Sequence, residues 1–166
     1  MPRQLGLQIV VQPHEIGPFQ FGTSTAVQTG TTAAPVAFGI TYLEAIDDDA
    51  AQRVRDMSRE CMMELMHIPG FIGAVTAKIG QRMITMSAWS NTDAMSASVR
   101  KGAHGAAMKP FYEGTIASSG FTSVWSPARI NPYWIRCTAC GSMVDTSKHG
   151  RVCPCGADLP GHPPYW

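Results

Sequence analysis

The sequence predicts an α+β fold of the ferredoxin-like type, with the element order β-α-β-β-α-β, followed by a small metal-binding tail. Two observations lead to this prediction. Apolar, β-branched runs alternate with two stretches of helical composition between residues 36 and 130. Four of the five cysteines then lie between Cys137 and Cys155. We therefore expect an N-terminal extension (residues 1–35), an α+β domain (36–130) and a zinc-ribbon-like tail (131–166).

Composition limits the function before any motif is considered. The 166 residues are 45% hydrophobic and 15% charged, which is typical of a globular chain with one core and a small appendage. Thirteen Lys and Arg balance twelve Asp and Glu, so the chain lacks the basic charge that binding to nucleic acid or an acidic membrane needs. No long apolar run or signal peptide is evident, and clustered cysteines suit a reducing compartment, so we expect a cytoplasmic protein.

The first part of the chain predicts a strand followed by a helix. In the extension, Leu5–Val11 reads as a short strand, and the Gly-, Thr- and Ala-rich stretch Gly17–Pro35 is typical of turns and linkers. Val36–Ile46 is a β-branched and aromatic run, and the three aspartates that follow suit a helix N-terminus. The helix should end at Pro69-Gly70. Its apolar stripe has helical spacing: Ala50, Val54, Met57, Cys61, Leu65 and Ile68.

The second part predicts a hairpin, a helix and a last strand. Phe71–Ile79 and Arg82–Trp89 are separated by a two-residue turn and should pair antiparallel. Capping residues at Ser90 begin a helix that should run to about Lys109, and Phe121–Ile130 supplies the final strand. Two helices then cover one face of an antiparallel sheet. The other face needs a cover, and a second copy of the chain is the simplest one, so we expect a homodimeric α+β barrel.

The cysteines form two pairs with metal-ligand spacing. Cys137-Thr-Ala-Cys140-Gly is followed by Cys153-Pro-Cys155-Gly, and two thiolate pairs on tight turns can converge on one tetrahedral ion. A glycine after each pair lets the backbone turn without a Cβ clash. The pattern is similar to zinc ribbons and rubredoxin-type knuckles, and it predicts a metal site.

The second half of this motif is one residue shorter than usual. His149 or His162 is therefore an alternative fourth ligand, although we favour four sulfurs. We expect zinc rather than iron, in a structural role, because a tail of this size is too short to form a sufficient apolar core.

Two short segments carry a resemblance to a known group. Met86-Ser-Ala-Trp-Ser-Asn-Thr-Asp-Ala-Met95 and Gly102-Ala-His-Gly-Ala-Ala-Met108, within the β-α-β-β-α-β order, resemble the antibiotic biosynthesis monooxygenase group of dimeric α+β barrels. Members tend to carry a tryptophan at the end of the third strand, a capped helix after it and a histidine late in that helix. The resemblance implies a small oxidoreductase that tailors a bulky aromatic or polyketide-like substrate.

The resemblance implies catalytic candidates, each with a structural alternative. A cofactor-independent oxygenase needs a dry cavity, a base and donors for the developing oxyanion. His104 is the candidate base, Trp89 a wall and indole donor, Asn91 a polar orienter, and Tyr42 an additional phenolic donor. The alternatives are a surface or interface histidine, a core tryptophan and a helix-capping asparagine.

Two other functions remain open from the sequence. In one, the chamber holds non-covalent haem with His104 as axial ligand, and His67 and His14 are weaker candidates for that role. In the other, the barrel is a non-enzymatic module for dimerisation or ligand binding, and the knuckle contacts a partner protein. Cys61 lies on the apolar stripe of the first helix, so we expect it to be a packing residue.

Overall fold

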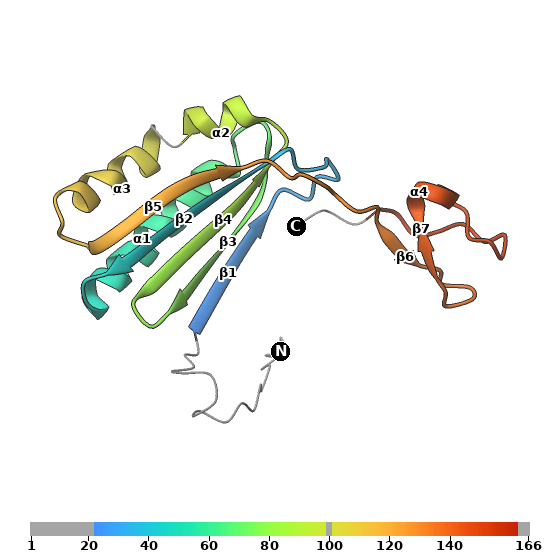
Figure 1. The fold of residues 1–166 in the computed structure, drawn as a ribbon, viewed down its shortest axis with the longest axis horizontal. Helices are drawn as coiled ribbons and strands as arrows, with labels where there is room; N and C mark the ends of the chain where they lie inside the picture. The colour runs from blue at the N-terminus through green and yellow to red at the C-terminus, as the bar shows by residue number, and fades with distance from the viewer. Residues whose placement is uncertain (1–21, 99–100, 163–166) are drawn as a thin grey trace, which may run out of the picture.

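The computed structural model describes residues 22–98 and 101–162, which form a sheet covered by helices and, apart from it, a small second sheet (Figure 1). The strands and helices of the larger unit are β1 (Gly22–Gln28), β2 (Ala37–Ala45), α1 (Asp48–Leu65), β3 (Phe71–Ile79), β4 (Arg82–Trp89), α2 (Thr92–Ser98), α3 (Gly102–Tyr112) and β5 (Ala117–Trp125). The smaller unit contains β6 (Trp134–Arg136), β7 (Met143–Asp145) and α4 (Thr146–His149).

The sheet confirms the predicted ferredoxin-like topology. Its order is β1-β3-β4-β2-β5, and every pairing is antiparallel. Without β1, the remaining four strands and the intervening helices have the β-α-β-β-α-β arrangement. The hairpin strands β3 and β4 have the predicted bounds, because apolar and β-branched residues fill both segments and the Gly80 turn separates them.

The interpretation of Gly17–Pro35 as turn and linker was wrong in its middle part. Residues 22–28 form β1, which pairs with the edge of β3 along its whole length. The threonines, serine and valine of this stretch have good β-propensity, and pairing supplies the hydrogen bonds that an isolated segment lacks. The predicted strand Leu5–Val11 lies outside the described residues.

Helix α1 follows the prediction at its start. The side chain of Asp47 accepts a hydrogen bond from Ala50 N at 2.7 Å, and Asp48 and Asp49 occupy the first turn. The predicted second helix is instead two helices, α2 and α3. Gly102 begins α3 with a φ of 59°, and Pro110 lies inside the helix near its C-terminus, where it removes a single backbone donor.

Strand β5 also differs from its prediction. It spans Ala117–Trp125 rather than Phe121–Ile130, because pairing with β2 continues to the register Ala45–Ala117. The serines and Gly120 in its first half gave no apolar alternation, so only the tertiary pairing defines this part of the strand.

The helix-covered face of the sheet has two separate apolar clusters. One joins Val54 of α1 to Met83 of β4 and Ile116, and the other joins Met62 of α1 to Trp89 of β4 and Met95 of α2. Between them lies a row of threonines, one on each strand. The strand registers place them side by side in the order Thr25, Thr76, Thr85, Thr41 and Thr122. We call this set the threonine row.

The opposite face of the sheet carries apolar and aromatic side chains that the described chain leaves uncovered. Tyr42 and Phe121 lie 5.5 Å apart between ring centroids on β2 and β5. Phe121 and Trp125 are 57% and 59% exposed, and Met86 on β4 is 36% exposed. Large apolar residues gathered on one sheet face mark a surface suited to association.

The smaller unit has its own minimal core. Strands β6 and β7 pair antiparallel, and the side chain of Asp145 caps α4 by accepting hydrogen bonds from the N–H and hydroxyl of Ser147 at 2.9 and 2.6 Å. Its buried apolar residues are few: Cys137, Val144, Cys153 and Leu159. Across the described part of the chain, no helix has the length and apolar character needed to span a membrane.

Candidate functional sites

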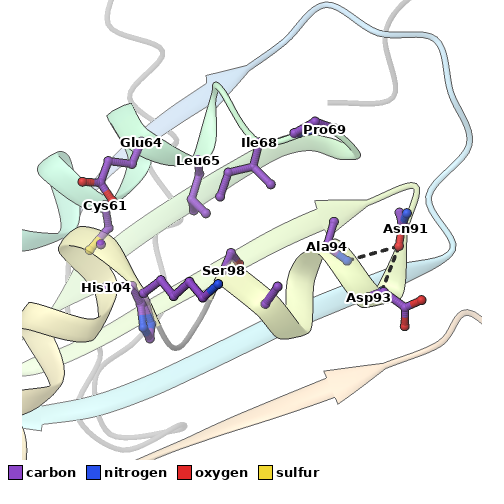
Figure 2. Close-up of a pocket in the computed structure, with 13 residues that line it drawn as sticks. Cys61, Glu64, Leu65, Ile68, Pro69, Asn91, Asp93, Ala94, Ser98 and His104 are labelled. Atoms are coloured by element: carbon purple, nitrogen blue, oxygen red, sulfur yellow. Dashed lines mark hydrogen bonds between the residues drawn. The ribbon is translucent and has the colours of Figure 1, made fainter.

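A pocket of about 600 Å³ opens between the C-terminal half of α1 and the helices α2 and α3 (Figure 2). Leu65 of α1, Ile68 of the turn that follows it and Ala94 of α2 supply apolar lining. Two of the predicted catalytic residues, His104 and Asn91, line the same pocket. The fold therefore brings these two side chains to one cavity, with Asn91 and His104 toward its opposite ends.

Asn91 is the cap of α2. Its Oδ1 accepts hydrogen bonds from the N–H groups of Asp93 and Ala94, at 2.9 and 3.1 Å (Figure 2). The carbonyl half of the amide is therefore committed to the helix. The NH₂ half carries the remaining donors that a pocket ligand can use.

His104 lies in the first turn of α3, and a contact from α1 fixes this turn. The Glu64 carboxylate of α1 accepts a hydrogen bond from Ala103 N at 2.7 Å, which supplies the cap that Lys101, the N-cap residue of α3, does not provide. A Cβ at Gly102 would lie 2.2 Å from Glu64 Oε2. The glycine thus allows the carboxylate to approach the helix, and α1 positions His104.

Trp89 lies apart from this pocket. It is 1% exposed, its ring makes an edge contact with Phe71 at 5.2 Å between centroids, and its indole N–H donates to Ser87 Oγ at 2.9 Å. Its donor is thus directed along β4. Tyr42 points to the uncovered sheet face, where its hydroxyl donates to Glu44 at 2.8 Å.

Cys61 borders the pocket as a protonated thiol. Burial is the largest cause that raises the pKa of the Cys61 thiol, and the nearby carboxylates of Glu64 and Glu60 add to it. Together they raise this pKa to about 11. A thiol with this pKa is a poor nucleophile at neutral pH. This supports the prediction that Cys61 packs against its neighbours rather than reacts.

The second candidate site is the four-cysteine cluster of the smaller unit. The sulfur atoms of Cys137, Cys140, Cys153 and Cys155 all lie within 4.8 Å of one another. The Cys137–Cys155 and Cys140–Cys153 sulfur pairs are 3.8 and 3.6 Å apart. A regular tetrahedron of sulfurs about 2.3 Å from a zinc ion has edges of about 3.8 Å, so the cluster has the dimensions of a zinc site.

The shortened second half of the motif does not prevent the four sulfurs from converging. Gly141 and Gly156 adopt φ values of 79° and 89°, which turn the chain after each cysteine pair. His162 instead contacts the ring of Tyr133, at 3.9 Å between centroids. The geometry therefore favours four sulfur ligands over the histidine alternatives.

The electrostatics of the cluster also favour a cation. The backbone N–H and hydroxyl of Ser142 lower the pKa of Cys140 to about 6, and the backbone N–H of Cys140 lowers the pKa of Cys137. The N–H of Cys155 lowers the pKa of Cys153, but burial and the neighbouring thiols outweigh it and raise this pKa to about 12. Four sulfurs this close cannot all ionise unless a cation balances their charge.

Sequence reasoning missed Glu64 and Gly102. Glu64 is a charged residue at the border of the apolar stripe of α1, and the group that it caps is 39 residues away in the chain. No local motif marks such a contact between helices. The signal that existed was Gly102 itself, a glycine within a helical stretch, which indicates a break or a close approach.

The comparisons with known proteins identify the fold. NE2512 of Nitrosomonas europaea, a protein of unknown function, aligns with a TM-score of 0.50 at 14% identity over 61% of this chain and 97% of its own. A mutant of SnoaB, a cofactor-independent oxygenase from Streptomyces nogalater, aligns with a TM-score of 0.50 at 9% identity over 60% and 100%. A candidate antibiotic biosynthesis monooxygenase from Deinococcus radiodurans aligns with a TM-score of 0.51 at 10% identity over 58% and 97%.

The sequence matches no protein-family model and no curated protein. At identities of 9–14%, the structural neighbours establish a shared fold, and they span about 60% of this chain. The chain therefore has the α+β fold of the antibiotic biosynthesis monooxygenase-like proteins, and it carries in addition a four-cysteine knuckle.

Proposed function

We propose that the chain is a small monooxygenase-type oxidoreductase that acts on a bulky aromatic or polyketide-like molecule and carries a structural zinc ion. The observation that supports it most directly is the 600 Å³ pocket that His104 and Asn91 share, in a fold also found in the cofactor-independent oxygenase SnoaB. A largely apolar cavity with a few polar groups is typical of a site for a small aromatic ligand.

In the proposed reaction, His104 is the base. For an anthrone, it removes a proton from the reactive methylene, and the resulting carbanion reduces O₂. One oxygen atom of O₂ becomes the new carbonyl oxygen, and the other leaves as water with the two methylene hydrogens. The amide NH₂ of Asn91 orients the substrate oxygen, and Trp89 supports the pocket from the core behind α2.

The proposal is tested by oxygen consumption with anthrone as the probe. His104→Ala should lower kcat by about 100-fold or more, the usual contribution of a general base. His67→Ala is the matched control, because His67 is exposed and does not line the pocket. Asn91→Asp keeps the oxygen that caps α2 but loses the NH₂ donor, so it should raise KM without unfolding the helix. Unchanged turnover in His104→Ala would remove His104 from the mechanism.

The two alternative functions, a haem-dependent enzyme and a non-enzymatic module, can be tested with the same purified protein. A Soret band in the visible spectrum of the purified protein would favour the haem-dependent reaction, with His104 as axial ligand. A colourless protein with no turnover of any aromatic tested would favour a ligand-binding or protein-interaction module. One zinc per chain by metal analysis is expected in each case, because the four sulfurs hold it independently of the pocket.

We also propose that the chain forms a homodimer through the uncovered sheet face. Phe121, Trp125 and Met86 supply the apolar surface that a second copy would bury. Met86→Glu should convert the dimer to a monomer in light scattering. Met63→Glu is the control, since Met63 is 59% exposed on α1 and lies away from this face. A wild-type chain that is monomeric at micromolar concentration would contradict the proposal.

A further inference from the structure

A second cavity lies on the other side of α1, away from His104. It has a volume of about 300 Å³ and lies between α1 and the sheet edge formed by β1 and β3. Its lining residues come from α1, β1, β3 and, through Met83, β4. The strand β1, which the N-terminal extension adds to the fold, forms one wall. We call this cavity the edge groove.

Three cationic side chains and one carboxylate, that of Asp56, line the edge groove, so its net charge is positive. Arg55 and Arg59 lie one turn apart on α1, and Lys78 of β3 lines the cavity with them. Two like charges at this helical spacing repel each other by about 0.2–0.5 kcal/mol, and this repulsion is relieved when an anion lies between them. Within the described part of the chain, neither guanidinium forms an ion pair.

The acidic side chains near the groove already have other partners. Asp56 lines the cavity, but its carboxylate accepts a hydrogen bond from Gln52 at 3.0 Å. Asp48 binds Lys78 at 3.2 Å and Gln81 at 3.0 Å. Lys78 is therefore shared with Asp48. Arg55 donates one hydrogen bond to Gln52 Oε1, so Arg59 and the remaining donors of the Arg55 guanidinium are the main attraction for an anion.

The inner part of the groove combines hydroxyls with apolar surface. Thr25 and Thr76, the first two members of the threonine row, lie opposite each other on β1 and β3 and line the cavity. Met62 of α1 and Met83 of β4 lie beside them. The groove thus offers two guanidinium groups on its helical side, hydroxyls on its strand side and soft apolar side chains for the body of a ligand.

We infer that the edge groove is a second binding site, for a small organic anion whose carboxylate or phosphate contacts Arg55 and Arg59 and whose apolar body lies against Met62 and Met83. Arginine matches both oxyanions with its planar fork of donors. Thr25 and Thr76 add hydroxyl hydrogen bonds to the same group. This site is separate from the His104 pocket, so it does not depend on the proposed oxygenase activity.

Titration of the zinc-loaded full chain followed by NMR tests the inference. The probes are phenyl phosphate and benzoate, with benzyl alcohol as the uncharged comparison. Both anions should shift the resonances of residues around Arg55 and Thr76 and saturate, and benzyl alcohol should not. The tighter of the two anions identifies the preferred oxyanion. Arg55→Gln/Arg59→Gln should weaken binding about tenfold.

Two further variants make the result specific. Arg129→Gln makes the same chemical change at an exposed position outside the groove, so it should leave the affinity unchanged. Thr76→Val keeps the β-branched shape and removes one hydroxyl, so it should weaken binding about threefold while the fold is retained. Absence of saturable binding by both anions in the folded wild type would overturn the inference. Equal weakening by Arg129→Gln would also overturn it, because it would show non-specific charge attraction.

Discussion

The two units of this molecule are stabilised in different ways. The larger unit buries two apolar clusters between a five-stranded sheet and its helices, with Trp89 and Ile72 almost fully enclosed. The knuckle buries four apolar residues, two of which, Cys137 and Cys153, belong to the four-cysteine cluster. An apolar core can hold the first unit together without a ligand, whereas we expect the second to need the bonds that a metal ion would form.

Of the changes considered, removal of the metal should have the largest effect on structure. It should unfold the knuckle and leave the larger unit folded. A chelator or Cys153→Ser should unfold the knuckle, since structural zinc typically contributes about 10 kcal/mol or more to a small metal-binding unit. In NMR spectra, the signals of β6, β7 and α4 should lose their chemical-shift dispersion, while those of the five-stranded sheet should keep it. Cys61→Ser is the control and should retain zinc. Dispersed knuckle signals in the metal-free protein would contradict the expectation that the knuckle, unlike the larger unit, needs a metal ion to fold.

A substitution in the core of the larger unit should destabilise that unit and leave the knuckle folded. Trp89→Ala removes an indole that is 1% exposed, so the larger unit should lose about 3–5 kcal/mol of unfolding free energy in urea denaturation. The zinc content of the folded fraction should stay the same. Trp134→Ala, at a site that is 53% exposed in the knuckle, should leave the stability of the larger unit within about 0.5 kcal/mol of the wild type.

A pair of glycine substitutions tests how α1 holds α3 within the larger unit. Gly102 and Gly114 have φ values of 59° and 69°, so alanine is strained at both, by about 1 kcal/mol. Only at Gly102 would the new Cβ meet Glu64, because nothing lies within 4 Å of the corresponding position at Gly114. Gly102→Ala should therefore destabilise the chain by about 1 kcal/mol more than Gly114→Ala, measured by thermal unfolding.

The smallest effect concerns the one cysteine outside the knuckle. Because burial raises the pKa of Cys61 to about 11, it should react slowly with a disulfide reagent at pH 8, and Cys61→Ser should abolish this reaction in the zinc-loaded protein. The thiol ionises more easily in the unfolded chain. Its contribution to stability is therefore complete below the unfolded pKa and is lost as the pH rises through the range from about 9 to 11. Rapid modification at pH 8 would show that the thiol is accessible.

Local patterns were sufficient for the elements whose packing the sequence itself encodes. The stripe of α1, the Asp47 cap and the hairpin between Ile79 and Arg82 follow from periodicity and turn chemistry, and the cysteine spacing predicted their convergence. The elements that depend on distant partners could not be predicted. β1 and the first half of β5 are polar strands that pairing defines, and the pocket that His104 and Asn91 both line depends on how α1, α2 and α3 pack against one another.

The threonine row has a consequence for how this fold can diverge. Threonine and valine have nearly the same shape, so a hydroxyl on the inner sheet surface can be exchanged for a methyl without moving the backbone. A Thr85→Val substitution would connect the two apolar clusters and favour stability. The native threonine hydroxyl instead favours contact with a polar ligand. The chemistry of the interior can therefore change one strand at a time while the architecture is inherited unaltered.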